Sequence, residues 1–484
     1  MRFSRVFLAN LISHETSLFR QRAVLRAGMG YIAQALEDAG VACAVDDMAL
    51  GFGFGRLRRK IRDFGPDAIG ISMFTYRYAE AYAAVARLKK EFGVPVIVGG
   101  PHASVFRGKL LEECPSADFC MVREGERSIV KLCRGEDFSK IEGLIYRENS
   151  AVRSAPPAVF IDDLDALAFP RYRAFERQNY PLGNSPVSRR VIPLVTSRGC
   201  PYECIYCPVN AAIGRKLRCR GADSVVSEIS HWRAEGYRNF SVVDDNFTLI
   251  KDRVYKICEG IKRAGFSDIT LGLPNGIRAD KTDRQMLETM YDAGFRYVGI
   301  GVESGCDAVL KALKKSEPVA VIDEAIKNAV EIGYYVDLYF LVGSPGETER
   351  DVMASIALAA KYPVDKAHYF NLIPYPGTEL FDTVAKAGRF LYPPEYYLNN
   401  IHSNMNVPVF ETKEFPAAAR ARMLKYAKRA ERLRKKELYR RRLASKGLPA
   451  FAARAASSVY SYEPVRVIFN DSALLAGIKE RMMK

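Results

Sequence analysis

Three cysteines lie close together near the middle of the chain. Cys200, Cys204 and Cys207 have three and then two residues between them. Soft thiolates on one loop can converge on a single metal centre. Structural zinc sites usually complete four protein ligands, and the nearest further candidates, Cys219 and His231, stand at no familiar zinc spacing. Three cysteines with one open position favour an iron–sulfur cube whose fourth iron binds a substrate or cofactor; a zinc knuckle, or cysteines without a shared ligand, is the alternative.

The elements that must position this loop are predicted by alternating β-branched runs and helical stretches. Six candidate strands lie between residues 191 and about 387, namely 192–196, 240–243, 269–273, 297–302, 336–342 and 367–372. Six βα units predict a partial or complete barrel, in which the chemistry sits on the loops after the strands. The cysteine loop directly follows the first of these strands.

The N-terminal part of the chain has the same alternation. Five candidate strands, 6–9, 42–46, 68–72, 94–98 and 119–122, are separated by amphipathic stretches such as 23–37 and 78–91. This pattern predicts a doubly wound parallel sheet of the Rossmann or flavodoxin kind, which binds ligands beyond the carboxyl ends of its strands. Small residues there let a flat or bulky ligand approach the backbone. The strand-end candidates are Ser72, Met73, Thr75, Gly99, Gly100, Pro101, His102, Glu124, Gly125 and Glu126.

We therefore expect an α/β protein with four parts. The N-terminal sheet occupies residues 1–140, and a linker with a hairpin (143–146 paired with 158–161) occupies 141–190. The partial (β/α)6 barrel occupies 191–390, and a basic, helical region follows at 391–484.

Composition limits the class of protein. The chain has 484 residues, a length that can bury a core without disulfide bonds. Hydrophobic residues make up 48% and charged residues 26%, which is typical of a globular protein. Ten cysteines are too dilute for a disulfide framework, and no run of about 18 apolar residues predicts a membrane span. We expect a cytoplasmic protein.

The positive charge is concentrated in the C-terminal region. Lys and Arg number 72 against 56 Asp and Glu, and residues 420–442 contain most of this excess. Met423, Tyr426, Ala430 and Leu433 form a narrow apolar stripe by which a solvated helix could pack on the barrel. The alternative is a surface for anionic lipid or an acidic partner, so peripheral membrane contact is an expectation. No nucleic-acid partner is expected, because no binding motif accompanies the charge.

The cysteine loop, with Tyr206 just before its last cysteine, resembles the CxxxCxxC loop of the radical S-adenosylmethionine (SAM) superfamily. Later segments agree in order and spacing, namely 244–248, 275–278, 301–305, 343–347 and 374–378. The N-terminal sheet, with its segments 99–104 and 124–126, resembles the cobalamin-binding domain of the B12-dependent (class B) subgroup. Together the resemblances cover residues 1 to about 390.

The resemblance implies three cofactors: a [4Fe-4S] cluster held by Cys200, Cys204 and Cys207, SAM, and cobalamin. The SAM-binding residues that it implies are Tyr206, Arg278, Glu303, Gly343, Ser344 and Pro345. Glu303 would accept hydrogen bonds from the SAM ammonium or ribose, and Arg278 would pair with the SAM carboxylate; a purely structural, buried Glu303 is the alternative. The strand-end residues of the N-terminal sheet would contact cobalamin. No catalytic residue is identified.

One departure from the family's pattern concerns cobalt. The DxHxxG signature is absent, and His14 stands after the first strand. His14 and His102 are candidates for contact with the corrinoid, and simple hydrogen bonding is the alternative for both. A domain that has lost its corrinoid is also an open reading.

The function that the resemblance implies is methylation of an unactivated carbon, with one SAM methylating the corrinoid and a second yielding a 5′-deoxyadenosyl radical. Cyclisation or rearrangement on the same scaffold, radical chemistry without a corrinoid, and a non-enzymatic corrinoid or redox sensor remain alternatives. We expect a small-molecule or lipid-like substrate, since Tyr392, Tyr396 and Tyr397 would suit an apolar one, and a reducing electron donor.

Overall fold

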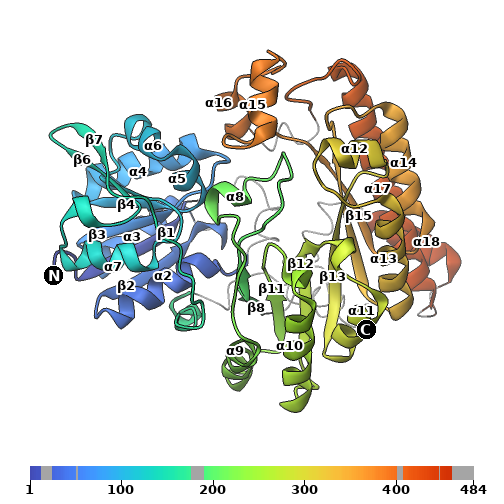
Figure 1. Ribbon diagram of the computed structural model, residues 1–484, viewed down its shortest axis with the longest axis horizontal. Coiled ribbons are helices and arrows are strands. Elements are labelled where there is room, and N and C mark those ends of the chain that lie inside the picture. The colour runs from blue at the N-terminus through green and yellow to red at the C-terminus, as the bar shows by residue number, and fades with distance from the viewer. Residues whose placement is uncertain are drawn as a thin grey trace.

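The computed structural model describes residues 1–11, 24–50, 53–175, 190–400, 407–445, 447 and 449–460. Two sheets lie side by side, the N-terminal one on the left of Figure 1 and the second on the right. His14 lies outside the described residues, so the structure gives no test of its predicted role.

The N-terminal sheet has seven strands in the order β2-β1-β3-β4-β5-β6-β7. The five parallel strands are β1 (Arg5–Asn10), β2 (Ala42–Asp47), β3 (Ala68–Ser72), β4 (Val96–Gly99) and β5 (Phe119–Met121). Alternate strand residues enter two separate cores, as expected for a sheet buried on both faces. Helices α2 (Ala27–Asp38) and α7 (Glu126–Arg134) cover one face; α3 (Phe54–Phe64), α4 (Tyr78–Phe92), α5 (Pro101–Phe106) and α6 (Gly108–Glu113) cover the other.

The hairpin predicted for the linker belongs to this sheet. Strands β6 (Leu144–Glu148) and β7 (Ala151–Ser154) pair antiparallel and extend the sheet from β5. The sheet therefore passes the boundary predicted at residue 140, and the second strand lies at 151–154 rather than 158–161. The reason is physical: β7 is an exposed edge strand, which has no apolar alternation to reveal it.

The second sheet has six parallel strands in the order β15-β14-β13-β12-β11-β8, so each pairs with its sequence neighbour. They are β8 (Val191–Leu194), β11 (Asn239–Val242), β12 (Thr270–Ile277), β13 (Phe295–Glu303), β14 (Tyr335–Val342) and β15 (Lys366–Asn371). Helices α9 (Ala222–Ala234), α10 (Lys251–Arg263), α11 (Arg284–Asp292), α12 (Asp307–Ala312), α13 (Val319–Ile332) and α14 (Glu349–Lys361) connect them (Figure 1). Because β8 and β15 do not pair in the described chain, the barrel is partial.

Short elements fill the connections. After β8 the chain forms β9 (Ser197–Arg198), α8 (Val209–Ala212) and β10 (Arg218–Cys219), with β9 and β10 antiparallel. Single turns of 3-10 helix occur at Met48–Leu50, Phe138–Lys140, Tyr172–Ala174, Phe247–Leu249 and Ala279–Lys281.

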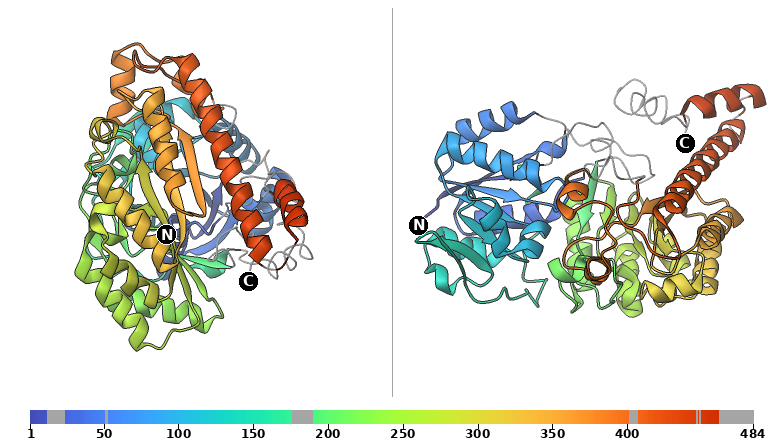
Figure 2. Two further views of the ribbon diagram at one scale, coloured as in Figure 1. Left: turned by 90° about the vertical axis from the view of Figure 1, so that its right-hand side faces the viewer. Right: turned by 90° about the horizontal axis from the view of Figure 1, so that it is seen from above.

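The C-terminal region consists of α15 (Glu379–Lys386), α16 (Pro394–Asn399), the long α17 (Ala417–Ser445) and α18 (Ala450–Tyr460). Figure 2 shows α17 lying along the outer edge of the barrel, where it packs against β15 and α14. Its buried apolar side chains are Met423, Leu424, Ala427 and Leu443. Of the predicted stripe, Met423 is buried as expected, whereas Tyr426 and Leu433 were wrong, since they are 48% and 57% exposed.

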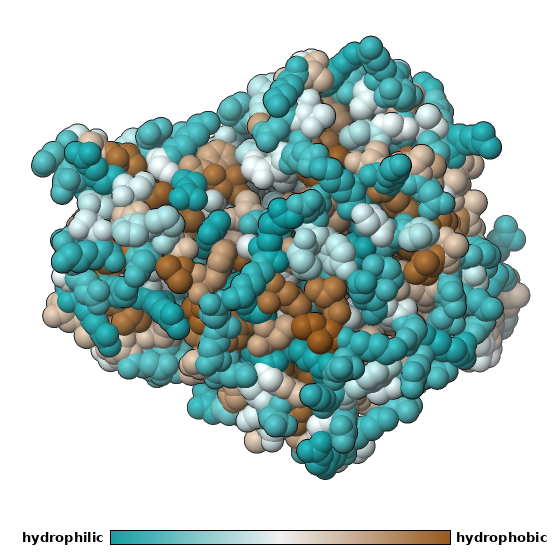
Figure 3. All heavy atoms as spheres, in the orientation of Figure 1, coloured by the Kyte–Doolittle hydropathy of each residue, from teal (hydrophilic) through white to brown (hydrophobic). Residues whose placement is uncertain are grey.

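The three tyrosines predicted to suit an apolar substrate, Tyr392, Tyr396 and Tyr397, also differ in burial. Tyr397 is fully buried, and its hydroxyl donates to the Pro374 carbonyl at 2.6 Å. Tyr392 and Tyr396 stack on each other and are partly exposed. No helix in the described part of the chain is long and apolar enough to cross a membrane. The face in Figure 3 is largely hydrophilic, and its apolar side chains gather in small groups.

Candidate functional site

The carboxyl ends of both sheets open into one shared cavity. Its volume is about 370 Å³, and its lining comes from both domains. The N-terminal sheet contributes Ser72, Gly99 and Gly100, whereas the barrel contributes Ser197, Val243 and Asp245, among others. Each sheet therefore presents its ligand-binding edge to the other.

Most of the predicted corrinoid contacts line this cavity. They are Ser72, Gly99, Gly100, Pro101, Glu124, Gly125 and Glu126, whereas Met73, Thr75 and His102 are not among the lining residues. Gly100 has φ +97°, and a Cβ atom there would lie 2.9 Å from the Met73 carbonyl oxygen. The close passage of the two strand-end loops therefore requires glycine at this position. The strand-end residues that line the cavity are those predicted to contact a corrinoid.

His102 is the predicted contact that the structure places elsewhere. The side chain is fully buried, with its ring between Tyr78 and Phe106 at centroid distances of 5.0 and 4.1 Å. Its Nε2 atom hydrogen-bonds the Tyr82 hydroxyl at 2.7 Å. Burial lowers the pKa of His102 to about 3, so the ring is neutral. The reading of His102 as a corrinoid contact is thus corrected, because the aromatic side chains of α4 and α5 enclose it.

Glu124 and Glu126 join the two domains. Arg198, which follows the first barrel strand, pairs with Glu126 at 2.8 Å and with Glu124 at 3.2 Å. Arg218 of β10 pairs with Glu124 at 2.7 Å and donates to the Ile161 carbonyl. All four side chains are at most 10% exposed. These buried ion pairs fix the spacing of the sheets, and with it the cavity.

The cysteine loop lies between residues that line the barrel side of the cavity, Ser197 and Arg198 before it and Ala212 and Ile213 after it, whereas the three cysteines are not among the lining residues. Gly199 has φ +95°, and a Cβ atom there would meet the Lys216 carbonyl oxygen at 2.3 Å, so the loop needs glycine at its start. Burial raises the pKa of all three thiols, to about 12 for Cys207, so a bound metal must supply the free energy to deprotonate them. No three described His, Cys, Asp or Glu side chains are arranged to hold a single ion. A cube suits these cysteines because each thiolate binds a different iron.

Two buried polar side chains that follow barrel strands lack nitrogen or oxygen partners. They are Asn246, four residues after β11, whose amide contacts the Cys200 thiol, and Ser344, two residues after β14. The two residues are 2% and 0% exposed. Buried polar groups almost always find partners, so these atoms are free for a polar ligand. SAM, with its ammonium, carboxylate, ribose and adenine groups, fits such a set.

Glu303 ends β13 in a strained conformation. Its φ is +61°, at a shift in the pairing register between β13 and β14. The carboxylate is paired with Lys315 at 3.3 Å, and Lys315 also pairs with Glu317 at 3.2 Å. Left-handed backbone at a non-glycine residue costs about 1–3 kcal/mol and clusters at functional sites. Tyr206 lies beside Glu303, and burial and this carboxylate raise the pKa of its hydroxyl.

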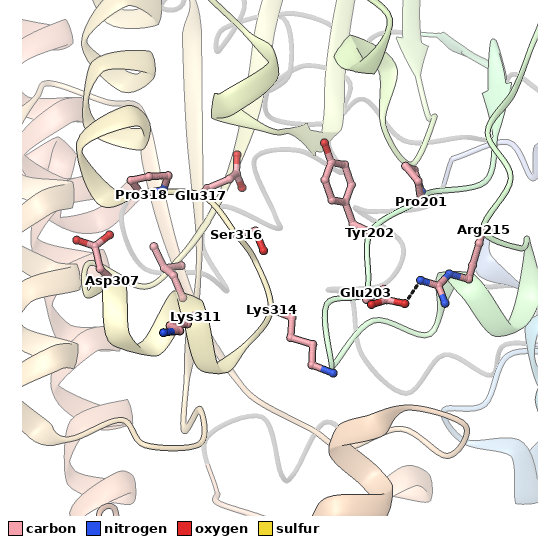
Figure 4. Close-up of a pocket in the computed structure, with 11 residues that line it drawn as sticks. Pro201, Tyr202, Glu203, Arg215, Asp307, Lys311, Lys314, Ser316, Glu317 and Pro318 are labelled. Carbon is pink, nitrogen blue, oxygen red and sulfur yellow. Dashed lines mark hydrogen bonds and ion pairs between the residues drawn. The ribbon is translucent and has the colours of Figure 1, made fainter.

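Arg278 is engaged by protein groups. It pairs with Asp280 at 2.9 Å, donates to the Lys315 carbonyl at 2.9 Å, and lies 3.6 Å from the centroid of the Tyr202 ring. This guanidinium supports the cysteine loop through Tyr202, and its predicted pairing with a SAM carboxylate stays a prediction. The loop's outer side forms a groove of about 820 Å³. Figure 4 shows the Glu203–Arg215 ion pair on the loop side of this groove and Lys311 and Lys314 on the opposite side.

The turn after β14 contains the remaining SAM candidates. Gly343 has φ +106°, and the buried Glu347 carboxylate accepts hydrogen bonds from the Gly343 and Ser344 amides at 2.5 and 3.0 Å. Burial raises the pKa of Glu347 to about 7. Pro345 completes the turn before α14.

Sequence reasoning missed several residues of the site. Asn246 lies within segment 244–248, which matches the radical SAM pattern, but its own sequence neighbours do not mark it as a ligand-binding residue. Lys315 was missed because a lysine in a polar loop carries no local signal of burial; it is 6% exposed. Arg198 and Arg218 were missed because their partners are 72 and 94 residues away along the chain.

Two family models match the chain. The Radical SAM superfamily model matches residues 194–359, and the B12 binding domain model matches residues 24–132. The first contains the cysteine loop, Glu303 and the turn at 343–347. The second contains the strand ends of the N-terminal sheet up to Glu126.

Three curated relatives illustrate the similarity. An uncharacterized methyltransferase of Pyrococcus horikoshii is 29% identical over 73% of this chain and 77% of its own. The cytidylyl-2-hydroxyethylphosphonate methyltransferase of Streptomyces wedmorensis is 27% identical over 84% and 86%. An anaerobic magnesium-protoporphyrin IX monomethyl ester cyclase of Cereibacter sphaeroides is 26% identical over 73% and 59%.

A solved structure shares the fold. The radical SAM methyltransferase TsrM of Kitasatospora setae, with tryptophan and a SAM analogue bound, has a TM-score of 0.68 and 19% identity over 79% of this chain and 76% of its own. A second structure of TsrM, with cobalamin and a [4Fe-4S] cluster, has a TM-score of 0.65.

Proposed function

The chain is a radical SAM enzyme with an N-terminal B12-binding domain, and from that premise we propose that it is a methyltransferase acting on an unactivated carbon. Its cofactors are a [4Fe-4S] cluster, SAM and cobalamin. The single observation that carries the proposal is the shared cavity, into which both sheets turn their ligand-binding ends. A corrinoid on the N-terminal strand ends would present one face to the barrel mouth, where SAM and substrate meet.

When bound, the cluster and SAM supply a carbon radical, and the corrinoid supplies a methyl group. The chain's residues do the positioning. Cys200, Cys204 and Cys207 hold the cluster, and Glu303 accepts hydrogen bonds from SAM. The Asn246 amide and the Ser344 hydroxyl bind polar atoms of the same molecule, and the buried ion pairs of Arg198 and Arg218 hold the two domains together at the cavity.

The function can be tested without knowing the substrate. Enzyme purified anaerobically with cobalamin is reduced and given SAM whose methyl group carries deuterium. We expect about one corrinoid per chain, S-adenosylhomocysteine, and transfer of the labelled methyl group to the corrinoid, all detected by mass spectrometry. Release of 5′-deoxyadenosine with no methyl transfer to a bound corrinoid would contradict the proposal.

Cyclisation or rearrangement is the second candidate, favoured by the similarity to a cyclase. The same assay separates the two, because such chemistry consumes SAM to 5′-deoxyadenosine without forming S-adenosylhomocysteine. Intact cluster without any corrinoid would favour radical chemistry that is independent of the N-terminal domain. An external reductant is required in either case.

The proposed partners are a small-molecule or lipid-like substrate and an anionic membrane surface. Lys425, Arg429 and Arg432 are exposed on α17 at spacings of four and three residues, so they share one face. Tyr426 and Leu433 lie exposed beside them. A basic face with neighbouring apolar side chains is typical of helices that lie on anionic lipid.

Charge reversal tests this partner. The triple variant Lys425→Glu, Arg429→Glu, Arg432→Glu should lose sedimentation with vesicles containing phosphatidylserine. The control Arg59→Glu, Lys90→Glu, Lys256→Glu changes the net charge equally at exposed sites on other helices and should still bind. Equal binding by both variants would count against a membrane surface.

A further inference from the structure

An arginine of the C-terminal region is buried against the candidate SAM turn. Arg420 lies in the first turn of α17 and is 0% exposed. One of its Nη atoms donates to the Gly343 carbonyl at 2.5 Å, across 77 residues of sequence. The other donates to the Phe410 carbonyl at 2.7 Å. A fully buried guanidinium with two backbone acceptors is a specific arrangement, since uncompensated burial of a charge is very costly.

The surroundings of Arg420 hold it in one place. Its guanidinium carbon lies 4.1 Å from the centroid of the Phe410 ring and 5.6 Å from that of Phe415. A Cβ atom built on Gly343 would lie 2.5 Å from the same carbon. The guanidinium therefore occupies the space that a side chain at residue 343 would need.

Hydrogen bonds hold the turn at residues 343–347 from two sides. On one side the Glu347 carboxylate accepts the Gly343 and Ser344 amides. On the other, Arg420 binds the Gly343 carbonyl. The amide and the carbonyl of Gly343 are thus both hydrogen-bonded, as is the Ser344 amide. The peptide planes on either side of Gly343 therefore cannot rotate independently. The Ser344 hydroxyl is buried and has no hydrogen-bond partner; the second Glu347 oxygen and the Arg420 Nε also have none.

We propose that Arg420 is a positioning residue for SAM: by fixing the Gly343 carbonyl it aims the turn, including the Ser344 hydroxyl, at the SAM site. The first turn of α17 is then part of the SAM site. This inference rests on the assignment of residues 343–345 to SAM binding, which belongs to the proposed function.

The test compares Arg420→Met with Arg422→Met. Arg422 is two residues away on the same helix, but it is exposed and paired with Glu349 at the surface. Both variants are prepared as the full chain with cluster and cobalamin, and SAM affinity is measured by equilibrium dialysis with labelled SAM. We expect Arg420→Met to bind SAM at least tenfold more weakly and Arg422→Met to match the wild type.

A second set of measurements separates positioning from misfolding. Corrinoid content and iron content should stay unchanged in Arg420→Met, and hydrogen exchange at the amides of residues 343–347 should accelerate. In 5′-deoxyadenosine formation the KM for SAM should rise more than kcat falls. Arg420→Lys keeps the charge but reaches one carbonyl, so its SAM affinity should be intermediate; this variant decides the question if Arg420→Met does not fold.

Two results would overturn the inference. One is wild-type SAM affinity in a folded Arg420 variant; the other is equal loss of SAM and corrinoid binding, which signals a general structural defect. Because SAM binding is measured without a methyl acceptor, the outcome is independent of whether the enzyme methylates or cyclises. Failure of the wild type to bind SAM would instead refute the proposed function.

Discussion

Glu303 combines a left-handed backbone with a buried carboxylate whose partner in the structure is Lys315. Lys315 also reaches Glu317, so two carboxylates share one ammonium group. That leaves Glu303 with capacity to accept a hydrogen bond from a second cation. The ammonium of SAM has this chemistry, and it would convert an incomplete buried network into a satisfied one.

Replacing Glu303 with Gln should weaken SAM binding. Hydrogen bonds to charged groups contribute about 1.5–3 kcal/mol, which corresponds to roughly 10- to 100-fold in affinity. Equilibrium dialysis of the cluster-loaded protein measures it. Corrinoid content is the control and should not change; unaltered SAM affinity would support the purely structural role of this carboxylate.

His102 gives a pH prediction. Its pKa is lowered from 6.5 to about 3, so between these values the unfolded chain binds a proton that the folded chain does not. Stability is therefore complete above pH 6.5 and falls as the pH drops toward 3. In urea unfolding, the wild type should lose up to about 1.4 kcal/mol per pH unit more than His102→Phe over this range. Parallel pH profiles for the two proteins would contradict the burial of a neutral ring.

At the scale of elements, we expect loss of the cluster from the cysteine loop to leave corrinoid binding by the N-terminal domain intact. Cys204→Ser removes one of three thiolates, and we expect loss of most iron and sulfide and no SAM cleavage. Corrinoid binding should persist, because the residues that line the N-terminal side of the cavity are untouched. Iron analysis and the corrinoid absorbance spectrum measure both. Retention of a full cluster in this variant would show that Cys204 is not a ligand.

The strands could be predicted from sequence because each is buried and therefore apolar. Residues 336–342 and 367–372, for example, match β14 and β15 to within a residue at each end. The edge strand β7 could not be predicted, because its exposed residues lack an apolar pattern. The buried face of α17 could not be predicted either, because charged residues dominate the sequence of that helix. The same limit applies to the site. The cysteine loop is a local pattern, whereas the contacts of Arg198 with Glu126, of Arg278 with the Lys315 carbonyl and of His102 with Tyr82 join residues 72, 37 and 20 positions apart.

At the scale of the molecule, the two domains are held by buried charges. Arg218 is 2% exposed and Glu124 is 6% exposed at the side chain. Removing one partner of a buried pair costs about 3–5 kcal/mol, and the remaining pairing of Glu124 with Arg198 favours the lower value. We expect Arg218→Met to lower the thermal midpoint and to weaken corrinoid retention during gel filtration. In Arg218→Met the Glu124 carboxylate keeps its pairing with Arg198, so adding Glu124→Gln should lower the midpoint by less than Glu124→Gln does in the wild type; equal losses in the two backgrounds would argue against the Arg218–Glu124 ion pair.

The first turn of α17 binds the Gly343 carbonyl through Arg420, and the same helix presents the exposed basic residues Lys425, Arg429 and Arg432. One rigid element thus spans an internal site and an external surface. By thermodynamic reciprocity, whatever free energy a surface partner of this helix contributes to SAM binding, SAM must return to the binding of that partner. If the proposed anionic surface is that partner and the coupling is not zero, the fraction of enzyme bound to the surface would change with SAM concentration.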